Sequence, residues 1–128
     1  MRTVFEFTST AFPPYEDGQD AVQECLYGRR LAEHLAAALG ARGYTVLLVT
    51  PEDWGWVVEL DNKAFPLWIG CGSDMDVPNG FRCFIEPSSP TVRKWFRKTD
   101  TRSVVEPLAD ALEAILREQS DDVRRLAD

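Results

Sequence analysis

The sequence has few of the residues that build common catalytic and metal centres. Its 128 residues include one histidine and three cysteines. His34 and the cysteines show none of the spacings typical of zinc sites, and Cys71 has no CxxC partner. No glycine-rich phosphate loop is present either. We therefore expect no metal and no cofactor, and the odd number of cysteines favours reduced thiols over a disulfide framework.

Long apolar runs are also missing. No run approaches the roughly 18 residues that a membrane-spanning helix needs. The first residues, MRTVFEF, lack the apolar centre of a secretory leader. We expect a cytoplasmic protein with neither a spanning segment nor a membrane partner.

Positive charge is scarce as well. Lys and Arg number 14 against 21 Asp and Glu, so the net charge is −7. Such a chain repels nucleic acid and leaves room for a basic partner. The exception is residues 91–102, which carry +4 around Trp95 and Phe96 and leave −11 on the remainder. They would bind single-stranded nucleic acid, or they form a helical turn that buries both aromatic side chains; we favour the helical turn.

The length fits one domain, residues 1–128. Apolar periodicity predicts elements in the order β-α-β-β-β-β-α, at residues 2–8, 20–42, 44–49, 56–61, 65–71, 81–86 and 104–118. A short helical piece at 91–98 and a helical tail after 120 complete the prediction. The strand at 44–49 is apolar almost throughout, so we expect it at the centre of the sheet. The fold class is α+β, a two-layer domain with a mixed five-stranded sheet and its helices mainly on one face.

Three of the predicted strands form an antiparallel meander joined by two turns. The first, a tight turn, pairs Val58 with Leu67, and the second turn pairs Ile69 with Cys83. This register places the strongly apolar side chains of all three strands on one face. In it Cys71 and Cys83 lie on a diagonal, too far apart for a disulfide.

The second face of the meander holds the candidate site. Its predicted rows are Glu59–Pro66–Glu86, Val57–Trp68–Phe84 and Gly55–Gly70–Arg82. If this face is open to solvent, it forms a shallow aromatic platform. If a helix or a second subunit covers it, its side chains belong to the core. Trp54, in an acidic loop, either joins an interaction surface or staples the loop to the core. The candidate binding residues are Trp54, Glu59, Trp68, Gly70, Arg82, Phe84 and Glu86.

Two carboxylates on this face raise the question of catalysis. Glu59 and Glu86 lie two strand spacings apart, roughly 9–10 Å, and inverting glycosidases hold their pair at roughly 6.5–9.5 Å. Alternating glutamates are also common on the wet face of a sheet, so we name no catalytic residue. Residues 74–80 have the composition of a calcium loop without its spacing, and we interpret them as a polar turn.

The runs PEDWGW, LWIGCG and FRCFIEP, within residues 51–87, resemble a family of small uncharacterised bacterial proteins. That resemblance implies no particular activity and no functional residues. In size and acidity the chain is also similar to the immunity proteins of bacterial toxin systems.

These observations favour a small protein-interaction module, of immunity or adaptor type, that binds a basic protein partner. Two alternatives stay open: a small-molecule or carbohydrate-binding domain, whether or not it is an enzyme, on the aromatic face, and nucleic-acid binding through residues 91–102. A homodimer would also account for the aromatic face.

Overall fold

The computed structural model describes residues 1–15, 28–74 and 76–127. Two helices and eight strands are found there. In chain order they are β1 (Val4–Thr8), α1 (Arg29–Ala41), β2 (Val46–Glu52), β3 (Gly55–Leu60), β4 (Leu67–Asp74), β5 (Gly80–Glu86), β6 (Thr91–Lys94), β7 (Arg97–Asp100), α2 (Arg102–Arg117) and β8 (Arg124–Leu126).

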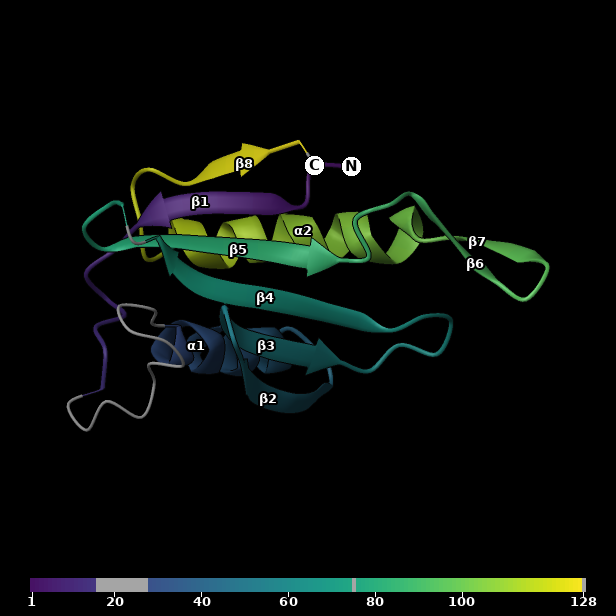
Figure 1. The fold of residues 1–128 in the computed structure, drawn as a ribbon, viewed down its shortest axis with the longest axis horizontal. Coiled ribbons are helices and arrows are strands. Elements are labelled where there is room, and N and C mark those ends of the chain that lie inside the picture. Colours follow the sequence, from purple (N-terminus) through teal and green to yellow (C-terminus); the bar gives the residue numbers. More distant parts are fainter. Residues whose placement is uncertain (16–27, 75, 128) are drawn as a thin grey trace.

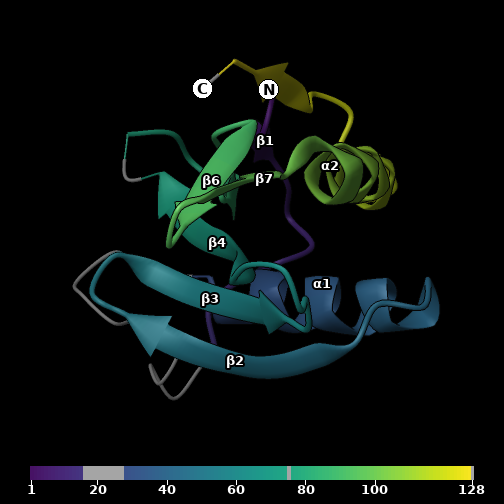
Figure 2. The same cartoon turned by 90° about the vertical axis from the view of Figure 1, so that its right-hand side faces the viewer.

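Six of the strands form the main sheet, in the order β2-β3-β4-β5-β1-β8. Every described pairing within it is antiparallel. Both helices lie behind the central strands in Figure 1, and the view in Figure 2 places them on the same side. The prediction of an α+β fold with helices on one face is therefore confirmed. The prediction of a mixed sheet of five strands is wrong, because β1 and β2 are not neighbours and β8 adds a sixth strand.

The core lies between the sheet and the two helices. Along β1, Phe5 and Phe7 are buried while Val4 and Glu6 are only partly covered, and the other central strands alternate in the same way. This period of two leaves one apolar face for the helices. The helices contribute buried side chains at helical spacing, among them Leu31, Leu35, Leu39, Leu108, Leu112 and Ile115.

The register of the meander differs from the prediction by two residues at both turns. Val58 pairs with Ile69, and Cys71 pairs with Cys83. The first turn is longer than expected, because the Asn62 side chain donates a hydrogen bond to the Phe65 carbonyl at 3.0 Å and closes a loop. Because side chains alternate between the two faces of a strand, a shift of two residues leaves each side chain on its predicted face. It changes which residues lie opposite each other on neighbouring strands, so the predicted cross-strand rows are wrong.

The second predicted strand is misplaced. It was expected at the sheet centre, buried on both faces, but β2 is an edge strand. Leu47 and Leu48 are 52% and 51% exposed. The register shifts between Val46 and Leu48, which marks a β-bulge. An apolar run alone does not distinguish a central strand from an edge strand.

The first helix agrees with the prediction at its end. Gly43 has φ 97°, so it provides the left-handed stop expected after a helix that ends at Ala41. Gly28 lies close against the sheet, since a Cβ there would lie 2.9 Å from the carbonyl oxygen of Cys71. Gly28 precedes the helix rather than lying inside it, and the part of the predicted helix at 20–27 is outside the described residues.

The C-terminal part of the chain departs from the prediction in two ways. Residues 91–100 form a β-hairpin rather than a helical piece. The last helix, Arg102–Arg117, agrees with the predicted 104–118 to within two residues at both ends, and Pro107 lies inside it. The tail forms β8, whose Arg125 donates hydrogen bonds to the carboxylates of Asp110 and Glu113 on α2 at 2.7 and 3.2 Å.

Asp122 joins this tail to the end of β1. Its carboxylate accepts hydrogen bonds from the Ser120 hydroxyl at 2.6 Å and from the backbone N–H and hydroxyl of Thr8, both at 2.8 Å. These bonds, the one from Ser120 first, lower the pKa of Asp122 from 3.8 to about 2. The carboxylate therefore stabilises the fold above pH 3.8, and that contribution is lost as the pH falls through about 2.

We expect Asp122→Asn to lower the melting temperature at neutral pH, because an amide cannot accept all three bonds. The difference from the unaltered chain should shrink as the pH is lowered through the same range. Thermal unfolding followed by circular dichroism at several pH values measures both effects. Asp121→Asn, at the neighbouring exposed carboxylate, is the control, and an equal effect there would contradict the role given to Asp122.

Candidate binding site

The face of the main sheet opposite the helices carries the candidate site. Its rows are Glu59–Trp68–Glu86 and Val57–Gly70–Phe84 across β3, β4 and β5. A third row joins Gly72, Arg82 and Glu6 across β4, β5 and β1. Neither described helix packs on this face, where Trp68 and Phe84 are half-buried and Glu59 and Arg82 are exposed. The structure thus brings the predicted residues of the meander onto one surface.

Trp54 completes an aromatic cluster on this face. Its ring centroid lies 6.2 Å from that of Trp68 and 5.2 Å from that of Phe84, and the latter two are 5.7 Å apart in an edge-to-face arrangement. These are favourable separations for aromatic pairs. Trp54 is 38% exposed, so it extends the open surface instead of fastening its loop to the core. We call Trp54, Trp68 and Phe84 the aromatic cluster.

Gly70 is the floor beneath the aromatic cluster. A Cβ at this position would lie 2.3 Å from Cζ of Phe84 and 2.8 Å from Cη2 of Trp54. The rings therefore occupy the space that any side chain at residue 70 would fill. The glycine permits the cluster to pack directly on the sheet, and that is its role in the site.

Hollows of different charge flank the aromatic cluster. One, of about 460 Å³, is lined by Thr50, Glu52, Trp54, Val57, Glu59 and Trp68. Another, of about 300 Å³, is lined by Trp54, Gly72, Ser73, Arg82 and Phe84. The first, which we call the carboxylate hollow, presents the carboxylates of Glu52 and Glu59. The second presents the Arg82 guanidinium. A ligand centred on Trp54 would meet negative charge on one side and positive charge on the other.

The geometry argues against joint catalysis by Glu59 and Glu86. Trp68 stands between them in the same row of the sheet. The predicted spacing of two strands holds, but an indole rather than a proline separates the carboxylates. A bond placed between them would collide with that ring, so these residues fit the rim of a binding surface better than a pair that acts on one bond.

Cys71 and Cys83, the two cysteines among the described residues, have the character of core residues. Cys71 and Cys83 are directly opposite each other on β4 and β5, which corrects the predicted diagonal, and both are buried free thiols. Burial, followed by a hydrogen bond with Cys71, raises the pKa of the Cys83 thiol well above 9.0. A protonated thiol is a poor nucleophile. His34 packs instead against Phe12, with ring centroids 5.3 Å apart. Among the described residues, no three His, Cys, Asp or Glu side chains gather as a metal site.

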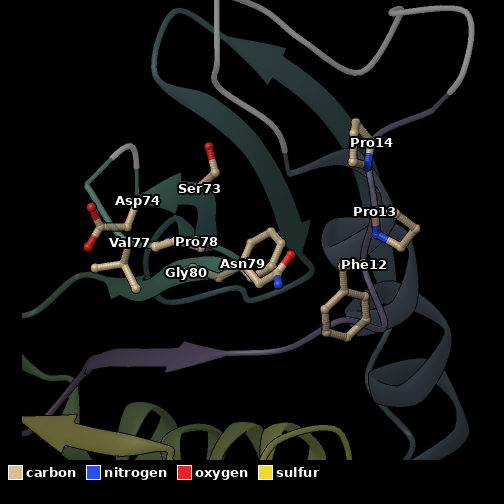
Figure 3. A pocket seen from close by; sticks show the side chains of 10 residues that line it. Phe12, Pro13, Pro14, Ser73, Asp74, Val77, Pro78, Asn79 and Gly80 are labelled. Atoms are coloured by element: carbon tan, nitrogen blue, oxygen red, sulfur yellow. The ribbon is translucent and has the colours of Figure 1, made fainter.

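A further pocket of about 270 Å³ lies at the turn between β4 and β5. Figure 3 shows Phe12, Pro13 and Pro14 on one side and Asp74 and Val77 on the other. Within the turn, the backbone N–H of Asp76 donates to Asp74 Oδ1 at 2.9 Å. That bond is typical of a polar turn, as predicted. Most of the lining consists of proline and other apolar side chains, which provide few groups for catalysis or hydrogen bonding.

Two parts of the surface were missed by sequence reasoning. Thr50 and Glu52 line the carboxylate hollow because β2 is an edge strand beside β3. Trp95 and Phe96, expected to be buried, are exposed at the end of the β6–β7 hairpin. The signal for the hairpin was present as two runs of four residues, TVRK and RKTD, on either side of the aromatic pair.

Fold and site together define a two-layer α+β domain with an aromatic, mixed-charge face on its sheet. Comparison of the chain with protein-family models, curated proteins and solved structures gave no match. The resemblance of residues 51–87 to a bacterial family therefore stays a prediction. Neither helix in the described residues has the length and apolar character to cross a membrane.

Proposed function

We propose that this protein is a cytoplasmic protein-interaction module, of adaptor or immunity type, that binds a basic partner through the aromatic face. The observation that carries the proposal is the aromatic cluster packed on Gly70, on the sheet face that neither described helix covers. Tryptophan is enriched in the residues that dominate binding energy at protein interfaces. Three aromatic rings in mutual contact provide a preformed anchor with little side-chain freedom left to lose.

Charge supports a basic partner. Glu52 and Glu59 line the hollow beside Trp54 and are exposed, and the whole chain carries −7. Opposite charge accelerates association and makes it sensitive to salt. The exposed Leu48 lies in the same row as Glu59 and Trp68, so a partner that contacts the cluster would also cover part of the β2 edge.

Affinity purification from the native host tests this proposal. We expect a stoichiometric basic protein whose cross-links fall on Lys63, at the edge of the meander, and whose retention falls as salt is raised. Trp54→Ala should lose the partner, whereas Val77→Ala, at an equally accessible apolar side chain in the turn between β4 and β5, should retain it. Equal capture by both variants would contradict the assignment of the site.

A small-molecule or carbohydrate ligand is the second candidate. The hollow of about 460 Å³ beside Trp54 and Trp68 favours it, since such pockets combine aromatic walls with a few polar groups. Intact mass spectrometry of the gently purified protein distinguishes the two candidates, because a bound compound that disappears in Trp54→Ala would replace the protein partner.

A further inference from the structure

The β6–β7 hairpin ends in two adjacent aromatic side chains that contact little else. Lys94 pairs with Arg97, so Trp95 and Phe96 form the two-residue connection. Their side chains are 86% and 100% exposed. Figure 1 shows the hairpin projecting beyond the end of the main sheet. The aromatic pair is therefore the apolar tip of a protrusion and not part of a flat patch.

The backbone of the tip is unfavourable for the residue that it carries. Trp95 has φ 60°, and Phe96 is not in the positive-φ region. A two-residue hairpin with positive φ at its first position normally has glycine there. A bulky side chain in this conformation is uncommon and often marks a functional position. The chain thus holds an indole at the tip where turn preference would select glycine.

Cations lie directly behind the tip on both faces of the hairpin. Arg93 pairs with Lys98 across the strands and shares a face with it, while Arg97, one residue along, belongs to the other face. All three side chains are exposed. Within the described part of the chain no carboxylate forms an ion pair with them, since Asp100 binds Arg102 at 3.1 Å. Like charges across a hairpin repel each other, so the hairpin favours an external anion.

We propose that this hairpin tip docks on the surface of an anionic lipid membrane. A groove in a protein or nucleic acid presents charge to one face of a hairpin, whereas lipid headgroups surround an inserted tip on every side. Cations on both faces of the hairpin match the second arrangement. Tryptophan and phenylalanine partition into the headgroup region, and adjacent Lys and Arg bind anionic lipids.

The acidic body of the protein does not oppose this contact strongly. Strands of four residues extend roughly 13 Å, whereas charges are screened over about 8 Å at physiological salt. Most of the negative charge therefore lies beyond the range at which the membrane would repel it. Neither described helix is long and apolar enough to cross a bilayer, and a tip that docks among the headgroups needs no such helix. This contact goes beyond the proposed function and uses a separate part of the surface.

Cosedimentation of the full chain with vesicles tests the proposal. The probes are vesicles of phosphatidylcholine with about 30 mol% phosphatidylglycerol, and vesicles of phosphatidylcholine alone. We expect binding to the anionic vesicles that weakens as salt is raised, with a blue shift of tryptophan emission. Each cation removed should lower the partition coefficient about fivefold, so Arg93→Gln with Lys98→Gln lowers it roughly 25-fold.

The tip variant is Trp95→Gly with Phe96→Asn, a pair that suits the turn, so the hairpin should persist. It should bind anionic vesicles at least about tenfold less. Trp54→Ala is the control and should bind them normally, which keeps this test separate from that of the aromatic face. Equal binding to both kinds of vesicle, or full binding by the tip variant, would overturn the proposal. So would a tip-dependent interaction with single-stranded oligothymidylate, or self-association in sedimentation velocity, without binding to anionic vesicles.

Discussion

Gly55→Ala should lower the free energy of unfolding by more than about 3 kcal/mol. A Cβ at residue 55 would lie 2.2 Å from the carbonyl oxygen of Cys71 and 3.2 Å from Cα of Gly72. Both neighbours belong to the backbone of β4, which cannot move aside without breaking its pairing with β5. The start of β3 would have to separate from the sheet. Chemical denaturation monitored by circular dichroism measures the loss.

Gly40→Ala is the matched control for this prediction. Nothing lies within 4 Å of a Cβ at that position near the end of α1. Alanine is the better helix former by up to about 1 kcal/mol, so the control should leave stability unchanged or raise it. A Gly55→Ala protein as stable as the control would show that β3 and β4 approach less closely than described.

Substitution of both Trp68 and Phe84 with alanine should weaken partner binding at least about 100-fold, because interface hot spots contribute 2 kcal/mol or more each. The fold should survive. Both side chains lie on the face opposite the helices, and the helix-facing core, including Val58, Ile69 and Ile85, is untouched. The lost aromatic contacts should reduce stability by roughly 1–3 kcal/mol. Calorimetric titration with the purified partner and thermal unfolding measure the two effects.

Gly70→Ala offers a finer version of the same experiment. The nearest atoms to the new Cβ are the ends of the Phe84 and Trp54 rings, which can swing outward. This variant should remain folded and bind less tightly, because the cluster is displaced and not removed. A double alanine variant that unfolds would identify the face as core, and full binding by that variant would exclude the aromatic cluster as the contact surface.

The sequence predicted which residues of the candidate site share a face of the sheet. Trp68, Phe84, Glu59, Glu86 and Arg82 share a face because side chains alternate along each strand, whichever residues pair across it. The observed shift of two residues therefore preserved the face and changed only the neighbours. Trp68, and not Pro66, separates the two glutamates for this reason.

The contacts that make the site specific could not be predicted in this way. The position of Trp54 over Gly70 depends on how a loop folds back across the sheet. The carboxylate hollow depends on β2 lying at an edge, where the apolar run VLLV indicated a centre. For residues 91–100, the alternation of basic and aromatic residues fitted an amphipathic turn as well as a hairpin, and burial of Trp95 and Phe96 was the wrong choice.

The sequence by itself determined the α+β class, the side of the sheet that the helices cover, and the residues of the opposite face, because these follow from periodicity within single elements. The tertiary structure alone decided strand order, register, the aromatic cluster and the exposed hairpin tip. Those features depend on loop closure and on contacts between distant residues, such as the hydrogen bonds from Thr8 to Asp122. The residue pattern within a single helix or strand does not predict contacts between residues that are far apart in the sequence.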